Sequence, residues 1–329
     1  MVGRMPTELA TEEQLPWRAV STAAPLLIVL NVGSGHSDTA EVRSVIERVL
    51  GAAGRPFTVH EVKDGADLSQ IAAAAVENAR ETGAVVVAAG GDGTINTVAQ
   101  ATLGSGCAFG VLPLGTFNYF SRAHGIPSEP EEACRILLGD RAFQVQVGLV
   151  NDRVFLVNGS IGLYPQLLEE REDAKRRLGR TRWVAIGAAL KTLFTAHLQL
   201  RLDIESKQGR RHIVTPTLFV GNNRLQLERV GISGGALDDH RLTAVTLAPV
   251  SPLGMLGLVL RAIIGKLGAA EQVESFDFET LTVRSRFRAR HFKVATDGEV
   301  ERMRAPLRFR VAPHALWLIR PSERREDPG

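Results

Sequence analysis

The run of six apolar residues at positions 84–89 (AVVVAA) leads directly into a glycine-rich turn, GGDGTIN, at residues 90–96. An apolar run of this length is typical of a strand buried on both faces, and residues from about 95 to 103 have the pattern of a helix. Glycines let a backbone approach a ligand closely, and a helix N-terminus offers free N–H groups to an anion. The feature restricts the chain to folds in which a buried strand, a tight turn and a helix follow one another.

The order of strand, loop and helix recurs through the first half of the chain. We expect strands at residues 26–31, 57–62, 84–89 and 108–112. We expect helices up to residue 50 after the first strand, then at residues 68–82, about 95–103 and about 118–124. Strands that alternate with helices predict a parallel sheet covered on both faces.

From about residue 143 the pattern changes to short segments of alternating apolar and polar residues, which is typical of an antiparallel β-sandwich. Helical stretches at 183–197 and 253–267 interrupt it. The predicted fold class is therefore α/β plus β, with an α/β domain at residues 26–142 and a β-sandwich domain at 143–320 whose last segment is free to pack back on the first. Only the ends, residues 1–24 and 322–329, are expected to lack regular structure.

Composition excludes several classes of protein. The longest apolar run, residues 252–264, is interrupted by Arg261 and is shorter than the roughly 20 residues that cross a bilayer. The first residues lack the basic start and apolar core of a signal peptide. The two cysteines, Cys107 and Cys134, form no CxxC pair and are expected to be buried thiols, and the eight histidines form no HExxH motif. We predict a cytoplasmic protein, and peripheral contact with the inner membrane surface stays open.

Two further turns share the chemistry of residues 90–96. One is LPLGTFN at 112–118, and the other follows the first strand and consists of Asn31, Val32, Gly33, Ser34 and Gly35. Loops at the carboxyl ends of parallel strands converge on one crevice, which predicts a single nucleotide site. Asp92 would repel phosphate unless a cation intervened, which suggests Mg²⁺. The alternative is a glycine-rich turn with an aspartate cap, as in many α/β proteins.

These motifs, together with NGSIG at 158–162 and DGE at 297–299, resemble the diacylglycerol kinase catalytic domain superfamily, which includes bacterial lipid kinases and sphingosine kinases. The resemblance spans about residues 26–311. It implies a nucleotide-binding α/β domain and a lipid kinase of phospholipid biosynthesis. Such an enzyme uses ATP and Mg²⁺ to phosphorylate a hydroxyl of a diacylglycerol- or sphingosine-like acceptor.

The resemblance also implies roles for the matching residues. Nucleotide contacts fall on Asn31, Val32, Gly33, Ser34, Gly35, Gly90, Gly91, Asp92, Gly93, Thr94, Ile95, Asn96 and Thr116. Glu299 is the implied catalytic base, and Asp92 the catalytic carboxylate that serves Mg²⁺ rather than the core. A second metal site falls on Ala236, Asp239 and Arg241. Asp239, which follows two glycines, is alternatively a plain turn residue, and Asp297-Gly298 is alternatively a plain hairpin turn. Asp297 also competes with Glu299 as the base.

Two positions depart from the family pattern. Val32 stands where the family has proline, and Tyr119 stands where many of its lipid kinases carry aspartate. Because Tyr119 replaces that aspartate, the identity of the acceptor stays open. The alternatives are an NAD-kinase-like or other small-molecule kinase, whose relatives also use a GGDG turn, and a catalytically weak nucleotide or lipid sensor.

Basic residues alternate with other residues at Arg284, Arg286, Arg288 and Arg290. In a strand at 281–290, all four side chains would share one face. That face is either a solvated surface or a patch for an anionic membrane. The expected partners are a lipid or lipid-like acceptor and an anionic membrane surface, with no nucleic acid; a homodimer stays open.

Overall fold

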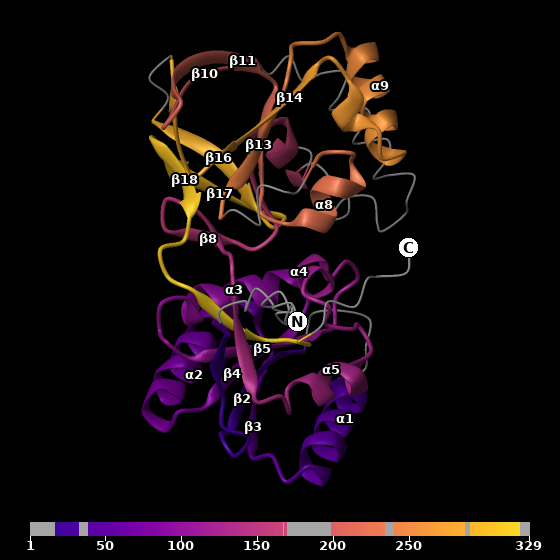
Figure 1. Ribbon diagram of the computed structural model, residues 1–329, viewed down its shortest axis with the longest axis vertical. Coiled ribbons are helices and arrows are strands. Elements are labelled where there is room, and N and C mark those ends of the chain that lie inside the picture. Colours follow the sequence, from indigo (N-terminus) through magenta and orange to yellow (C-terminus); the bar gives the residue numbers. More distant parts are fainter. Residues whose placement is uncertain are drawn as a thin grey trace, which may run out of the picture.

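The computed structural model describes residues 17–32, 39–166, 168–169, 199–233, 240–286 and 290–322. They form an α/β part and a β part stacked along the long axis of the molecule (Figure 1). This arrangement confirms the predicted fold class.

The α/β part is built on a seven-stranded sheet. Its strands, in spatial order, are β1 (Trp17–Ala19), β6 (Arg141–Val145), β19 (Leu316–Ile319), β5 (Ala108–Pro113), β4 (Val85–Gly90), β2 (Leu26–Asn31) and β3 (Phe57–Val62). The strands from β19 to β3 run parallel, β6 runs antiparallel to β19, and β1 pairs antiparallel with β6. Every residue of β4 and β5 is buried, as their apolar sequences predict.

Helices cover this sheet: α1 (Thr39–Ala52), α2 (Leu68–Thr82), α3 (Asp92–Thr102), α4 (Tyr119–Ala123) and α5 (Pro130–Ile136), with a short 3₁₀ turn η1 (Gly65–Asp67) before α2. Helix α1 packs beside α5 and α2 beside α3 (Figure 1). Helix α3 begins immediately after β4, so the turn at residues 90–93 lies at the carboxyl edge of the sheet.

The β part consists of two six-stranded sheets. One contains β11 (Gly209–Thr215), β10 (Leu200–Ser206), β15 (Thr280–Ser285), β18 (Leu307–Val311), β7 (Gly148–Val150) and β8 (Arg153–Phe155). The other contains β14 (Val273–Phe278), β13 (Leu242–Leu247), β12 (Thr217–Gly221), β9 (Asn158–Gly162), β16 (His291–Thr296) and β17 (Glu299–Arg304). Buried residues of both sheets, such as Ile204 and Val220, share one core, as in a sandwich.

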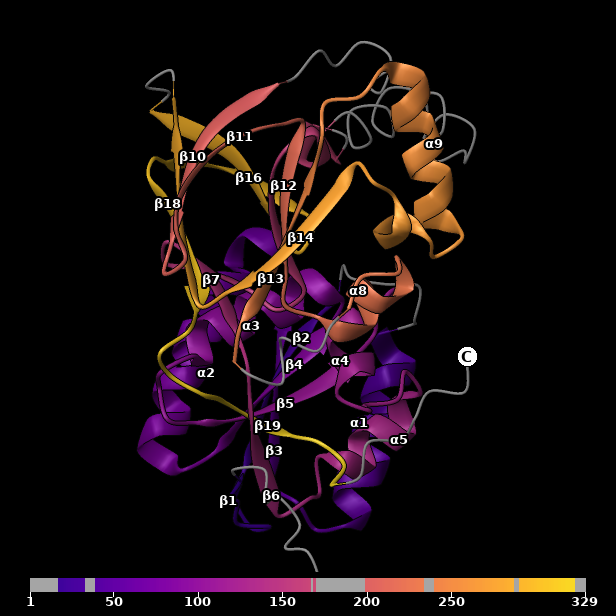
Figure 2. The same cartoon turned by 45° about the horizontal axis from the view of Figure 1, so that its top comes forward.

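The β part also carries helices α8 (Arg224–Arg229) and α9 (Pro252–Ile263), the latter followed by the 3₁₀ turn η3 (Leu267–Ala269), and residues 163–166 are helical as well. Figure 2 shows α8 and α9 on one side of the molecule, with α8 nearer the α/β part. No helix in the described ranges is long and apolar enough to cross a membrane.

Three expectations need correction or fall outside the described chain. Residues 17–19 form the edge strand β1, although we expected no element there; Trp17 and Arg18 contact Arg141 and Trp317 through cation–π pairs. Strand β15 ends at Ser285, so the strand expected over 281–290 is shorter and Arg286 lies beyond it, while Arg284 pairs with Glu205. The stretch 183–197 and Arg288 lie outside the described residues. The domain limits, 26–142 and 143–320, stay a prediction. The first sheet includes β6, which spans the limit between them, and β19, near the end of the second range.

Candidate functional site

The turn between β4 and α3 is packed too closely for a side chain at Gly90 or at the neighbouring Gly115. A Cβ atom on Gly90 would lie 2.6 Å from Cβ of Thr94, and one on Gly115 would lie 2.8 Å from Cα of Gly91. The N–H of Leu114 donates to the carbonyl of Gly90 at 2.9 Å. The two glycine turns predicted from the sequence therefore lie in direct contact at the carboxyl edge of the sheet.

Asp92 is the first residue of α3, and its two carboxylate oxygens have different surroundings. Oδ2 accepts a hydrogen bond from the N–H of Asn118 at 3.0 Å, at the start of α4. Oδ1 is buried and accepts no hydrogen bond in the described part of the chain. Burial raises the pKa of Asp92, and backbone N–H groups of Asn118 and Tyr119 oppose that rise. The carboxylate thus supports the fold as well, contrary to the expectation that it serves only a metal ion.

Asn118 closes the second turn. It adopts a left-handed backbone conformation with φ of 49°. Its Oδ1 accepts from the N–H of Gly115 at 3.1 Å, and its Nδ2 donates to the carbonyl of Gly115 at 2.8 Å. Thr116, between these residues, is exposed at the tip of the turn, where a ligand can reach it.

The end of β2 joins the same edge. Nδ2 of Asn31 donates to Oγ1 of Thr94 at 2.9 Å, and Thr94 is only 4% exposed. Ile95 is fully buried in the core, so its side chain cannot face a ligand, and its N–H donates to the carbonyl of Gly91 at 3.0 Å. Val32 is exposed. The remaining residues predicted to contact the nucleotide here, Gly33, Ser34 and Gly35, lie outside the described residues.

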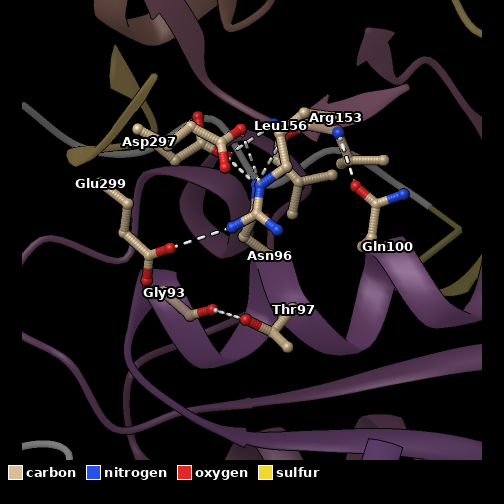
Figure 3. A network of polar contacts seen from close by, with 10 residues as sticks. Gly93, Asn96, Thr97, Gln100, Arg153, Leu156, Asp297 and Glu299 are labelled. Atoms are coloured by element: carbon tan, nitrogen blue, oxygen red, sulfur yellow. Dashed lines mark hydrogen bonds and ion pairs between the residues drawn. The ribbon is translucent and has the colours of Figure 1, made fainter. Parts of the chain in front are cut away.

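Asn96, a predicted nucleotide contact, directs its amide to the β part instead. It is 3% exposed, and Nδ2 donates to the carbonyl of Val154 at 3.1 Å and to Oδ2 of Asp297 at 2.7 Å. Gln100, one turn later, accepts from the N–H of Val154 at 2.7 Å and donates to the carbonyl of Asp152 at 3.1 Å. Helix α3 is therefore tied to strand β8 by two of its side chains, as Figure 3 shows.

Asp297 lies in the turn between β16 and β17, with φ of 49°, and Gly298 follows with φ of 96°. Besides Asn96, it accepts from the backbone N–H groups of Leu156, Val157 and Asn158 at 2.7–2.9 Å. Burial raises the pKa of Asp297, and these hydrogen bonds oppose the rise. The hairpin turn that the Asp-Gly pair suggests is present, and its aspartate holds the loop before β9.

Glu299, the predicted base, is the first residue of β17, and its side chain is 56% exposed. Its Oε2 lies 3.0 Å from Nη2 of Arg153, and its Oε1 lies 3.0 Å from the position that a Cβ atom on Gly93 would occupy (Figure 3). Residues about 200 apart in sequence thus place a carboxylate directly over the start of α3. Sequence reasoning missed Arg153, since nothing in its neighbourhood forms a motif.

Tyr119 takes the place of the family's aspartate at the start of α4. Its ring stacks on that of Phe117, with centroids 5.8 Å apart. Its carbonyl accepts from Nδ2 of Asn223 at 3.1 Å, and its hydroxyl accepts from Nη1 of Arg229 at 3.4 Å. Tyr119 therefore connects α4 to helix α8 of the β part.

The predicted second metal site is described only at Arg241, because Ala236 and Asp239 lie outside the described residues. The carbonyl of Arg241 accepts from Nε2 of Gln146 at 3.2 Å. No group of three or more histidine, cysteine or acidic side chains placed to hold a metal ion occurs in the described ranges. This site stays a prediction.

Comparison with known proteins adds an independent line of evidence. The sequence model of the diacylglycerol kinase catalytic domain matches residues 25–150. A protein named probable lipid kinase YegS-like from Pseudomonas aeruginosa (strain UCBPP-PA14) is 31% identical over 312 residues, which cover 90% of this chain and 94% of that protein. One of the same name from Cronobacter sakazakii is 30% identical over 174 residues, 51% of this chain and 56% of its own length. A crystal structure of a diacylglycerol kinase from Bacillus anthracis has a similar fold, with a TM-score of 0.68, 20% identity and coverage of 91% and 98% of the two chains.

Proposed function

We propose, on the premise that this chain belongs to the diacylglycerol kinase catalytic domain family of lipid kinases, that it transfers the γ-phosphoryl group of ATP to a hydroxyl of a lipid acceptor. The observation that carries the proposal is the position of the exposed Glu299 carboxylate over Gly93, at the start of α3. The carboxylate that we propose as proton acceptor and the turn that we propose to bind phosphate thus come together from the two parts of the molecule. Transfer of this kind depends mainly on positioning and electrostatic stabilisation.

The β4–α3 turn would hold the nucleotide phosphates. Gly93 presents no side chain beneath Glu299, and the N-terminus of α3 favours negative charge. Thr94 is buried, so we assign it a contact through its backbone N–H group only, whereas the N–H of Ile95 already donates to the carbonyl of Gly91 at 3.0 Å. Thr116, which is exposed on the neighbouring turn, would contribute its hydroxyl. Asn96 would position the second part of the molecule and would not touch the nucleotide.

The surroundings of Asp92 fit a magnesium ion. A buried carboxylate oxygen without a hydrogen-bond donor is costly unless a cation or a water molecule approaches it, and Mg²⁺ binds such oxygens. The ion would neutralise charge on the phosphate groups. Oδ2 stays with Asn118, so the protein itself orients the carboxylate.

Glu299 would accept the proton of the acceptor hydroxyl. Arg153 holds it over Gly93, and exposure leaves one face of the carboxylate open to an acceptor. Asp297 is a poorer candidate, because four hydrogen-bond donors already engage its two oxygens. This geometry supports Glu299 over Asp297, which the sequence left in competition.

The proposed acceptor is a diacylglycerol- or sphingosine-like lipid, which places the reaction at a membrane surface. The test is incubation of the protein with radiolabelled ATP, Mg²⁺ and a total lipid extract, followed by identification of the labelled product. Label in a lipid supports the proposal. Label in a water-soluble product instead would identify a small-molecule kinase of the NAD-kinase type.

Tyr119 favours one second candidate, a nucleotide and lipid sensor without turnover. The hydroxyl and carbonyl of Tyr119 already have partners in the β part, and the residue offers no carboxylate. ATP binding in the absence of labelled product from any extract would establish the sensor and overturn the kinase.

A further inference from the structure

Helix α9 exposes three large apolar side chains on one face. Leu253, Leu260 and Ile264 are 73%, 56% and 64% exposed. Their spacing of seven and four residues places them on the same side of the helix. A Cβ atom on Gly257, between them, would meet no atom within 4 Å. We call these three side chains the α9 face.

The opposite side of α9 already packs against the protein. Met255 and Leu258 are buried in a small cluster with Leu163 and Ala270. The helix therefore does not need the α9 face for its own packing. Clustered exposed apolar side chains of this size mark a surface that contacts another apolar phase.

The charged residues of the segment 252–270, which contains α9, are all positive. Helix α9 contains no acidic residue, and Arg261 and Lys266, next to the face, are exposed. Neither forms an ion pair with any acidic residue in the described part of the chain. Apolar side chains bordered by unpaired cations are complementary to a bilayer with anionic headgroups.

A continuous set of contacts leads from α9 to the candidate site. The N–H of Gly268, just after α9, donates to the carbonyl of Val230, at the end of α8. A Cβ atom on Gly231 would lie 2.4 Å from the carbonyl oxygen of Gly265, so the two segments touch through their backbones. Helix α8 carries Arg229, which donates to the hydroxyl of Tyr119. Figures 1 and 2 both show α9, α8 and α4 in this order along one side of the molecule.

We infer that the α9 face docks on an anionic lipid bilayer, and that the docked orientation brings the bilayer to the side of the molecule on which Tyr119 lies. The inference rests on the proposed function, since a kinase of a bilayer lipid must reach its acceptor there. The three apolar side chains enter the interface, while Arg261 and Lys266 meet lipid phosphates.

A second copy of this chain fits the α9 face less well. A two-fold dimer places the same patch of both copies together. Arg261 and Lys266 of one copy would then approach the same cations of the other, without acidic partners from α9. The charge pattern therefore favours the bilayer.

The test measures co-sedimentation of the full chain with vesicles, without ATP. One set of vesicles is phosphatidylcholine, and the other is equal parts phosphatidylcholine and phosphatidylglycerol. The triple variant Leu253→Ser, Leu260→Ser, Ile264→Ser should bind the mixed vesicles at least about tenfold more weakly. As matched single changes, Leu260→Ser should weaken binding, whereas Val214→Ser, at a residue in β11 that is 46% exposed, should not.

A second pair of changes tests the charges. Arg261→Gln with Lys266→Gln should weaken binding to the anionic vesicles several-fold, leave binding to phosphatidylcholine unchanged, and reduce the dependence on salt. Because all of these side chains are exposed, melting temperatures should stay at the wild-type value.

The outcomes separate the docking surface from the proposed reaction. Unchanged vesicle binding by both the triple variant and the charge variant would overturn the inference and leave the labelled-lipid experiment untouched. Unchanged vesicle binding together with a shift from dimer to monomer in sedimentation velocity would assign the α9 face to a second copy. If the variants lose vesicle binding but the wild type labels no lipid, the docking surface would stand and the proposed kinase activity would be overturned.

Discussion

Two glycine-containing turns face each other across the two parts of the molecule, and each carries a partly buried aspartate. Asp92 belongs to the turn between β4 and α3, and Asp297 to the turn between β16 and β17. Burial raises the pKa of both. Asp297 receives four hydrogen bonds, whereas Oδ1 of Asp92 receives none in the described chain. The difference indicates that Asp297 is structural, whereas Oδ1 of Asp92 is left for the metal contact proposed above.

The local backbone explains this difference. The loop 156–158 curves around Asp297 and points three successive N–H groups at its carboxylate. Asp92 instead sits on the first turn of a helix, and its Oδ2 accepts from the backbone N–H of Asn118 in the neighbouring turn. Glu299, two residues after Asp297, escapes the loop because Gly298 allows the hairpin to turn.

The largest effect is expected from Glu299→Gln, which keeps the shape of the side chain and removes its basicity. The maximal rate should fall roughly 10²–10⁴-fold, the usual contribution of general acid–base catalysis, with ATP affinity little changed. Single-turnover kinetics and nucleotide binding measure the two effects separately.

Glu301→Gln is the matched control for this change, because Glu301 also approaches Arg153, at 3.9 Å, and is similarly exposed. Its rate should stay near wild type. An unchanged rate for Glu299→Gln, together with an inactive Asp297→Asn that still binds ATP, would move the base to Asp297.

Asp92→Asn should lower phosphoryl transfer about 10²–10³-fold, because the charge that would hold Mg²⁺ is lost. The Asn side chain can still accept from the N–H of Asn118, so the melting temperature should stay near the wild-type value. Asp92→Ala loses that bond as well and should cost about 1 kcal/mol of stability. Wild-type turnover by Asp92→Asn at limiting Mg²⁺ would contradict the metal role.

The pH dependence of nucleotide binding tests the same residue. Since burial raises the pKa of Asp92, its carboxylate becomes protonated at a higher pH than that of an exposed aspartate. Binding of Mg²⁺·ATP should therefore weaken as the pH falls through this raised pKa. Asp92→Asn should lack that step.

Asp297→Ala should destabilise the fold by about 3 kcal/mol, because three backbone N–H groups and the Asn96 amide lose their acceptor. Denaturant unfolding measures this loss. Asp140→Ala is the control, since its side chain is 71% exposed, and it should change stability by less than about 0.5 kcal/mol. If Asp297→Ala were as stable as Asp140→Ala, Asp297 would not be structural, and the distinction between the two aspartate turns would be lost.

Much of this arrangement could be predicted from local sequence. The apolar runs predict β2, β4 and β5, because strands buried on both faces need continuous apolar residues. The glycine turns and the Asp-Gly hairpin follow from backbone conformations that glycine favours. Both cysteines are buried, as their residue type predicts. These features depend on short stretches of chain.

What the sequence did not reveal depends on contacts between distant residues. Asn96 looked like a nucleotide contact because it follows the glycines, yet its amide meets Asp297, 201 residues away. Arg153 meets Glu299 only because β8 and β17 come together in space. The alternation of arginines at 284–290 predicted one strand face, but β15 ends at Ser285, where alternation alone gives no stop signal.

The smallest effect is expected from Asn96→Ala, which removes the link between the two turns. It should cost about 1–2 kcal/mol of stability and lower the maximal rate only a few-fold, since Asn96 positions β8 and the β16–β17 turn without touching the reacting groups. Gln100→Ala is the matched control, because Gln100 bonds β8 but not Asp297. A double-mutant cycle of Asn96→Ala with Asp297→Ala should show coupling of about 1 kcal/mol, and the cycle of Gln100→Ala with Asp297→Ala should show less. Equal coupling in the two cycles would mean that α3 and β8 simply pack together, and that Asn96 does not specifically join the two aspartate turns.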